Sequence, residues 1–236
     1  MSVITISGNT GSGAVDIGQR VAKALKFDYM DRDILLESAT ALGVSMDTMA
    51  HRDERTLGFR ERLAEMFRDF LERSAMAGAA DPMMGSSGLE VLMATSYSEA
   101  AALPPREVSE FSEDRYKEAI TTIIDNVANK GNVVIIGRGS QVVLEGRPEV
   151  LHVRITAPFD TRVERVAERD GISVEAARHQ VHDTDKGRTD YHHKYFKVDP
   201  TNPDLYDVTI NTGHLSNKQA AELIVAAYRR KMPHSD

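Results

Sequence analysis

The 236-residue sequence contains no cysteine. This absence excludes disulfide bonds, thiolate metal sites and cysteine nucleophiles, so nothing in the sequence demands an oxidising compartment. Long apolar runs are also absent. None approaches the roughly 20 residues of a membrane-spanning helix, and the apolar stretch at residues 1–6 is too short for a signal peptide. These absences favour a cytoplasmic protein without a membrane partner.

The sequence also has fewer basic than acidic residues. Lysine and arginine number 29 against 36 aspartates and glutamates, which gives a formal net charge of −7. A general nucleic-acid-binding protein normally presents a strongly basic face, so we predict no nucleic-acid partner. The hydrophobic content of 41% and the charged content of 28% are ordinary for a globular domain. At this length we expect a single large domain spanning residues 1–236.

Short apolar runs alternate with helical patterns along the chain. Residues 3–6 form a β-branched run that ends directly at a turn, which is typical of a buried strand. Apolar residues then recur every four positions over 17–25, the pattern of an amphipathic helix. Similar patterns predict strands at 27–30, 133–136, 150–155 and 207–210, and helices at 119–130, at 160–169 and after Ser216. This alternation predicts an α/β protein of three layers: a doubly wound parallel sheet with helices on both faces.

The segment at about 45–112 does not continue this alternation, and we interpret it as a helical and irregular insertion. Residues 51–73 are densely charged and carry an apolar stripe at helical spacing, which predicts a helix. Residues 75–109 are rich in alanine, glycine, serine, methionine and proline, which predicts an irregular excursion. The methionines there fit loosely packed core filler or, alternatively, a surface for a partner or a lid.

A glycine-rich segment follows the first predicted strand. Its outer glycines, Gly8 and Gly13, have the G-x-x-x-x-G spacing of a P-loop between a strand and a helix. Glycines let successive backbone N–H groups point into one concavity, and the helix N-terminus adds partial positive charge. A glycine-rich turn without a ligand is the alternative. The residues that we expect to bind nucleotide phosphates are Gly8, Asn9, Thr10, Gly11, Ser12, Gly13 and Ala14.

This loop lacks the residues that usually complete a P-loop. Lysine and then serine or threonine normally follow the last glycine, whereas this sequence has Ala14-Val15. The cation for the β- and γ-phosphates and the hydroxyl for Mg²⁺ are therefore both missing. Loss of the cation would cost on the order of 10²–10³ in rate unless an arginine such as Arg32 or Arg162 replaces it.

Polar residues follow two other predicted strands, at the edge where a doubly wound sheet binds ligands. Asp31 and Arg32 pair an acceptor with a bidentate donor, which suits a phosphorylated, hydroxylated substrate. An N-cap aspartate beside a surface arginine is the alternative. Arg138 lies between two glycines, where its planar fork can reach a ligand. We therefore predict that all three bind substrate, with a structural salt bridge as the alternative for Arg138.

Residues 160–195 combine arginines with a charged segment. Arg162, Arg165 and Arg169 are three and four positions apart and therefore share one helix face. A second helix precedes the charged segment 182–188. Paired basic helices with such a hinge predict a lid that brings cations onto a phosphoryl group, and a solvated charged hairpin is the alternative. We predict no metal site, because the histidines of this region lack a pattern of supporting residues.

With these residues assembled, the chain resembles the cytidylate kinase-like branch of the nucleoside monophosphate kinases over nearly its whole length. The resemblance rests on residues 8–13, 29–35, 134–139 and 210–212, and on the arginine-rich helix with Asp183, Asp185 and Arg188. It implies a phosphate loop that binds ATP, an acceptor such as CMP or dCMP, and Mg²⁺ at the transferred phosphate. One departure is Gly139, which stands where cytidylate kinases have the aspartate of a Gly-Arg-Asp sequence.

The resemblance also implies a role for each site residue. Arg138 and Asp31 would face the acceptor, Arg162 and Arg188 would face the transferred phosphate, and Asp185 would brace the lid. We therefore predict ATP-dependent phosphoryl transfer to a nucleoside monophosphate or a similar small phosphorylated acceptor. A degenerate P-loop module that binds a nucleotide for regulation without turnover is the alternative. An interaction protein that uses the methionine-rich segment is a third hypothesis.

Overall fold

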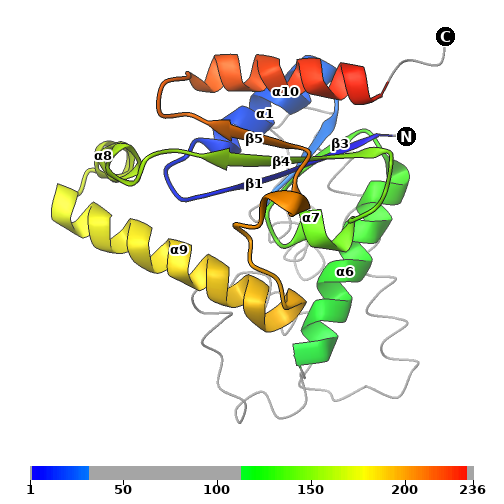
Figure 1. Ribbon diagram of the computed structural model, residues 1–236, viewed down its shortest axis with the longest axis horizontal. Helices are drawn as coiled ribbons and strands as arrows, with labels where there is room; N and C mark the ends of the chain where they lie inside the picture. The colour runs from blue at the N-terminus through cyan, green and yellow to red at the C-terminus, as the bar shows by residue number, and fades with distance from the viewer. Residues whose placement is uncertain (1, 32–112, 233–236) are drawn as a thin grey trace, which may run out of the picture.

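The computed structural model describes residues 2–31 and 113–232 (Figure 1). Within these ranges a single sheet is covered by helices on both faces. The predicted insertion at 45–112, its methionine-rich segment and Arg32 lie outside the described residues.

The strands of the sheet are all parallel and follow the order β2-β3-β1-β4-β5. They are β1 (Val3–Gly8), β2 (Asp28–Met30), β3 (Val133–Ile136), β4 (Val150–Thr156) and β5 (Val208–Asn211). In the central strand, Ile4 pairs with Val134 on one side and with Leu151 on the other. All three side chains are buried, as expected for a parallel strand covered on both faces. Because β1 and β3 are parallel neighbours, they deliver the glycine-rich segment and Arg138 to the same edge of the sheet.

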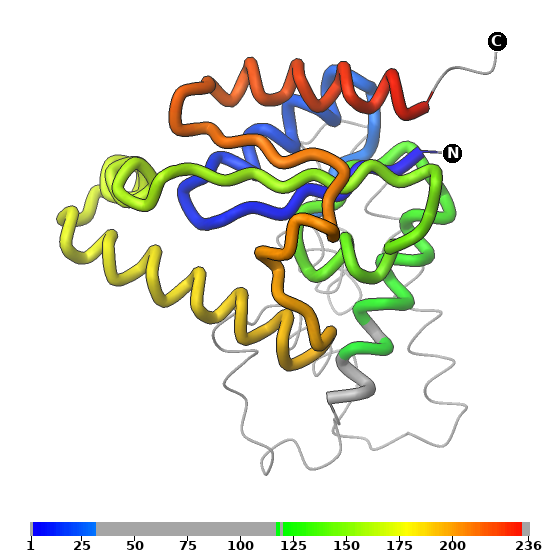
Figure 2. Tube along the Cα trace, in the orientation of Figure 1, coloured from blue at the N-terminus to red at the C-terminus, as the bar shows by residue number. Residues whose placement is uncertain are grey.

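Two layers of helices enclose this sheet. α1 and α10 lie side by side on one face, while α6 and α7 lie on the other (Figures 1 and 2). Ile17 and Val21 of α1 and Ile224 of α10 pack against the sheet in one apolar core. These helices are α1 (Ala14–Leu25), α6 (Glu113–Lys130), α7 (Ser140–Val143) and α10 (Asn217–Lys231). The predicted three-layer α/β fold is confirmed.

The remaining helices, α8 (Phe159–Asp170) and α9 (Val174–Phe196), form a hairpin beyond the carboxyl end of β4 (Figure 1). Val163 and Val166 of α8 pack against Ala177 and Val181 of α9 in a small apolar core separate from that of the sheet. The chain then returns to β5 through a 3₁₀ turn, η4 (Pro203–Leu205).

The predicted hinge at residues 182–188 is wrong. α9 runs through this segment as one helix of 23 residues. Two features outweigh the polar composition of the segment. Asp185 and Arg188 form an ion pair one turn apart, and Tyr191 and Tyr195 extend the buried stripe beyond it. The charged residues of the segment are consequently held at fixed helical spacing.

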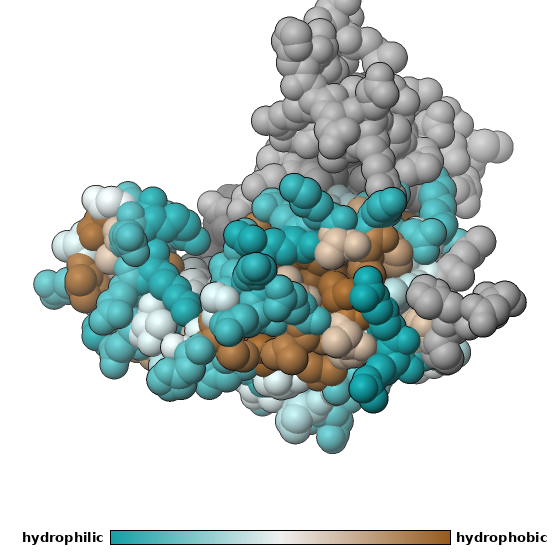
Figure 3. All heavy atoms as spheres, turned by 90° about the horizontal axis from the view of Figure 1, so that it is seen from above, coloured by the Kyte–Doolittle hydropathy of each residue, from teal (hydrophilic) through white to brown (hydrophobic). Residues whose placement is uncertain are grey.

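The face formed by α10 is mainly polar, with apolar side chains exposed between the polar ones (Figure 3). The predicted start of this helix is confirmed, because Ser216 and Gln219 form a capping box there. Across residues 2–31 and 113–232, no helix has both the length and the apolar character that crossing a membrane requires.

Candidate functional site

The glycine loop (residues 8–14) joins β1 to α1 and is folded closely onto itself. Ser12 N donates to Asn9 O at 3.0 Å. Gly11 has a φ of +78°, and a Cβ atom there would lie 2.6 Å from Arg162 O. Only glycine fits such a position, because any side chain would meet both backbone strain and a collision. The first turn of α8 therefore closely covers the loop.

The carboxylate of Asp185 joins this loop to both helices of the hairpin. Asp185 Oδ1 accepts from Thr10 N at 3.2 Å and from Arg188 Nη1 at 3.0 Å. Asp185 Oδ2 accepts from Arg162 Nη1 at 2.6 Å. Arg162 Nη1 also donates to Thr10 O at 3.1 Å. We call these four residues the Asp185 cluster.

The Asp185 cluster brings together all three residues that the sequence predicts to be catalytic. Their side chains are largely withdrawn from water: Arg162 is 9% exposed, Arg188 15% and Asp185 20%. One backbone N–H of the glycine loop and two guanidinium groups thus converge on a single anion. Guanidinium groups and loop N–H groups are also the donors that proteins use to hold phosphate.

Arg165 makes a second connection between α8 and the glycine loop. Its Nη1 donates to Thr212 Oγ1 at 3.0 Å and to Gly11 O at 3.4 Å, and its Nη2 donates to Thr212 O at 2.7 Å. The buried hydroxyl of Thr212 donates in turn to Ser12 O at 2.9 Å. The sequence places Arg165 on the arginine face of the predicted lid but does not predict this contact, because its partner Thr212 lies 47 positions away.

Arg169 does not reach the loop. Its guanidinium group forms an exposed ion pair with Asp170, and its side chain is 59% exposed. Only Arg162 and Arg165, among the three arginines on the predicted face, therefore contact the glycine loop.

The first turn of α1 is fixed from the side of α10. Asp16 Oδ2 accepts from Arg20 Nε at 2.9 Å and from Asn217 Nδ2 at 2.8 Å. Burial alone would raise the pKa of the Asp16 carboxyl, but these hydrogen bonds and the charge of Arg20 outweigh burial and lower it. The resulting negative charge in the first helical turn is favourable to the helix dipole.

The loop at residues 137–139 connects β3 to α7 and has an unusual backbone. Gly137, Arg138 and Gly139 have φ values of +72°, +57° and +76°, so three successive residues are left-handed. Arginine in this region costs about 1–2 kcal/mol, which the surrounding contacts must offset. A Cβ atom at Gly139 would collide with the ring of Phe196. Close packing of α9 against the loop therefore explains why glycine replaces the expected aspartate.

The predicted acceptor residues have different surroundings. Arg138 is 2% exposed and lies in the 137–139 loop. Asp31 follows β2, at the edge of the sheet beyond β3, and is partly buried. Their partner in the prediction, Arg32, lies outside the described residues.

A buried hydrogen-bonded pair joins α7 to α9. Gln141 Nε2 and His192 Nε2 are 3.0 Å apart, and His192 Nδ1 is 2.7 Å from Arg188 O. Because a carbonyl only accepts, Nδ1 carries the proton and Nε2 accepts from the Gln141 amide. Burial, with the nearby charge of Arg188, lowers the pKa of His192 to about 4. His192 is therefore neutral at pH 7, and neither it nor Gln141 was singled out by the sequence as a site residue.

One polar atom of the glycine loop has no partner within the described residues. Ser12 Oγ is buried and makes no hydrogen bond there. Such atoms are uncommon and call for an explanation, and a ligand phosphate on the loop would supply an acceptor. Ser12 Oγ is therefore a candidate hydrogen-bond donor to an anion at the loop.

The strand order, the glycine loop after the central strand and the arginine-bearing hairpin above it define a P-loop kinase-like α/β protein. A profile of the cytidylate kinase-like family matches residues 3–214, and the chain belongs to this family. The resemblance that the sequence motifs carry is thereby confirmed.

Similar curated proteins match only part of the chain. A cytidylate kinase of Methanopyrus kandleri is 32% identical over 108 residues, which cover 42% of this chain and 56% of that protein. A protein of Corynebacterium glutamicum named uronate isomerase is 36% identical over 111 residues, which cover 47% of this chain and 21% of that protein. The chain therefore spans about half the length of that cytidylate kinase and about a fifth of the isomerase.

A solved structure resembles nearly the whole chain. It is an uncharacterized protein from Eubacterium ventriosum, with a TM-score of 0.60 and 19% sequence identity. The likeness covers 97% of this chain and 98% of that one. At this level of identity it supports the fold alone.

Proposed function

We propose that the protein transfers the γ-phosphoryl group of ATP to CMP, dCMP or a similar small phosphorylated acceptor. The observation that carries this proposal is the Asp185 cluster, in which Arg162, Arg188 and a glycine-loop N–H converge on one anion. Transfer between phosphates needs no covalent intermediate with the protein. It depends on holding the two phosphates in line and neutralising charge, which such an arrangement supplies.

In this proposal the arginines of the Asp185 cluster exchange partners when ATP binds. Backbone N–H groups of the glycine loop and Ser12 Oγ receive the donor phosphates. Arg162 and Arg188, which now bond to Asp185, turn their donors to the transferred phosphoryl group. Asp185 keeps the two guanidinium groups paired until the ligand arrives, so little reorganisation is needed during the reaction.

Arg162 is the best candidate to replace the missing loop lysine. Its guanidinium group is 3.1 Å from Thr10 O, so its charge lies against the glycine loop, although it comes from α8 and not from α1. A guanidinium group is always charged and can bind phosphate through two N–H groups. An α8–α9 lid would then supply the cation only when it is closed on the loop.

Magnesium enters this scheme with the nucleotide. Bound Mg²⁺ would neutralise negative charge on the phosphates during transfer. Magnesium is usually held by substrate phosphates, water and one or two protein groups, so it requires few ligands from the protein. Ser12 Oγ fits as one such ligand because it is buried, polar and without a partner among the described residues.

We assign the acceptor to the side of the 137–139 loop. Arg138 is carried there by a strained backbone, and strain of this kind is retained where it serves a site. Arg138, Asp31 and Arg32 are the proposed acceptor-binding residues. The β3–α7 loop and the glycine loop follow neighbouring strands, which suits two phosphates that must meet.

A coupled assay of ADP release with CMP, dCMP, UMP and AMP tests the activity. We expect turnover with ATP and Mg²⁺ on at least one cytidine nucleotide. Arg162→Ala should lower kcat by about 10²–10³. Arg169→Ala is the matched control, because this arginine is on the same helix but exposed and away from the loop. Absence of turnover on all four acceptors would contradict the proposal.

A regulatory module that binds a nucleotide without turnover is the second candidate. It is favoured by Val15, which stands in place of the usual serine or threonine and is 51% exposed. Calorimetry separates the two candidates. Tight nucleotide binding that is unaffected by Mg²⁺, together with no ADP release, would support the regulatory module.

A further inference from the structure

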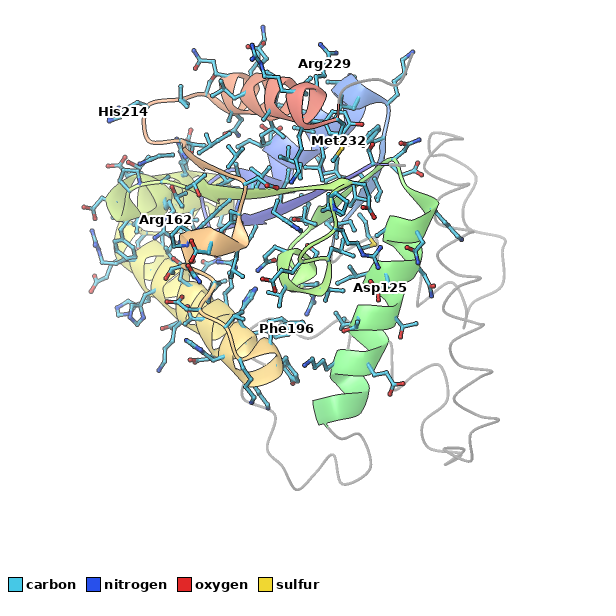
Figure 4. All side chains as sticks on the ribbon, turned by 45° about the vertical axis from the view of Figure 1, so that its right-hand side comes forward. Asp125, Arg162, Phe196, His214, Arg229 and Met232 are labelled. Carbon is cyan, nitrogen blue, oxygen red and sulfur yellow. The ribbon has the colours of Figure 1, made fainter. Side chains whose placement is uncertain are left out.

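One helix contacts both loops of the candidate site. At Asp185, α9 accepts a hydrogen bond from the glycine loop. At His192 and Phe196, the same helix contacts α7 and the 137–139 loop. Figure 4 shows Arg162 and Phe196 toward opposite ends of α9. Asp185 and His192 are two turns apart, about 10.5 Å along a continuous helix.

The contact at His192 is polar although it is buried. His192 is 1% exposed and Gln141 is also 1% exposed, yet the two side chains hydrogen-bond to each other. An apolar pair would fill this space without the desolvation penalty that each polar group incurs. The polar pair fixes the orientation of the imidazole ring, because one ring nitrogen must face Gln141 and the other must face Arg188 O.

The pair therefore fixes the orientation of α9 about its own axis. Gln141 lies in the four-residue helix that begins directly after Gly139, so its amide moves with the loop that carries Arg138. His192 Nδ1 bonds to the carbonyl of Arg188, whose side chain belongs to the Asp185 cluster. The ring of Phe196 packs where a side chain at Gly139 would be, and it limits sliding of the helix at the same place.

We propose that His192 is a positioning residue that, with Gln141, couples the phosphate-donor site to the acceptor site through α9. This inference rests on the proposed function. It goes further by stating that the binding of one ligand changes the affinity for the other. A donor phosphate that draws Arg162 and Arg188 from Asp185 changes how α9 lies against the glycine loop. The rigid helix transmits that change to the 137–139 loop, so that each ligand increases the affinity for the other.

Calorimetry with CMP and AMP-PNP tests this coupling. For the wild type we expect CMP to tighten AMP-PNP binding by about fivefold or more, with the same factor for the reverse order. His192→Phe keeps a ring but removes both hydrogen bonds. It should bring the factor to within about twofold of unity while each ligand alone binds almost as in the wild type.

Two variants separate positioning from packing. His192→Gln keeps an acceptor for the Gln141 amide and should restore most of the coupling. Gln141→Leu combined with His192→Phe replaces both polar partners, avoids an unpaired buried amide and should fold but remain uncoupled. His193→Ala is the matched control, because His193 is the next residue of the helix and is exposed. It should leave the coupling unchanged.

The outcomes distinguish this inference from the proposed function. A wild-type factor near unity, or a factor that survives in His192→Phe, overturns the coupling role even if the enzyme turns over. If the role of His192 is purely structural, His192→Phe will lower the melting temperature and leave the coupling factor intact. That result also overturns the coupling role. Failure of both ligands to bind the wild type, with no turnover, overturns the proposed function itself and the inference with it.

Discussion

At the scale of single residues, the carboxylate of Asp185 is the feature that organises the site. It accepts hydrogen bonds from donors of the glycine loop, α8 and α9. Its negative charge has the same sign as that of a bound phosphate. A ligand phosphate must therefore compete with an anion that belongs to the protein. This competition gives Asp185 two opposing effects, on stability and on affinity.

The variant Asp185→Asn separates these effects. Without the negative charge, Arg162 and Arg188 lose their ionic partner, and the free energy of unfolding should fall by about 1–3 kcal/mol. Inorganic tripolyphosphate should bind about three to ten times more tightly, because no internal anion competes for the arginines. Calorimetry measures the affinity and urea denaturation the stability. Asp170→Asn, which weakens the contacts of Asp170 with Arg169 and Gln180 away from the loop, should change neither ligand affinity nor the site. Weaker tripolyphosphate binding would show that Asp185 supports the ligand and does not compete with it.

Part of the dependence of the protein's stability on pH can be assigned to His192. Its pKa is about 4 in the folded protein, chiefly because of burial, against 6.5 for an ordinary histidine. The unfolded chain therefore binds a proton that the folded protein does not, and stability is lost as pH falls from 6.5 toward 4. The full loss is about 3 kcal/mol at most.

Urea denaturation between about pH 4.5 and 7.5 measures this loss. His192→Gln should remove the His192 share of the slope while keeping the hydrogen bond to Gln141. Burial also lowers the pKa of His152. The contribution of His152 to the dependence of stability on pH is present in both proteins, so the variant should keep a smaller slope than the wild type. Equal slopes in the wild type and the variant would show that His192 does not titrate as inferred.

At the scale of elements, the sequence predicts the sheet better than the site. The strands at 3–6 and 133–136 are short runs of β-branched residues, and each run ends at a serine or glycine, so both strands and the loops after them can be recognised from the local sequence. The predicted hinge at 182–188 fails because a polar segment continues as helix when buried tyrosines follow it. The sequence also does not predict the contact between Arg165 and the glycine loop, because this contact depends on Thr212, a threonine in a distant loop.

Arg165 tests how far the glycine loop depends on its neighbouring elements. Arg165→Lys keeps the charge but removes the planar fork that bonds to both Thr212 Oγ1 and Thr212 O. We expect a loss of about 1–2 kcal/mol in stability and a raised KM for ATP, with a smaller change in the KM for CMP. Arg169→Lys is the control on the same helix. Unchanged KM values would show that Thr212 and the loop backbone hold the glycine loop without Arg165.

At the scale of the whole molecule, the fold brings two loops from neighbouring strands under one helix. A ligand that binds only the folded protein stabilises it by about 2.7 kcal/mol at 100 times its dissociation constant. For a chain of this size, that raises the melting temperature by roughly 5–10 °C. A thermal-shift panel of nucleoside mono- and triphosphates therefore reports directly on both sites, without any need for turnover.

Arg138→Ala turns this panel into a test of the acceptor site. We expect the shift produced by CMP to be lost, because the guanidinium group that we propose to bind its phosphate is removed, while the shift produced by ATP stays close to that of the wild type. The variant also relieves little backbone strain, since alanine at a φ of +57° is no better suited than arginine. Its melting temperature without ligand serves as the reference for each shift. A CMP shift equal to that of the wild type would remove Arg138 from the acceptor site and leave its burial to a structural role.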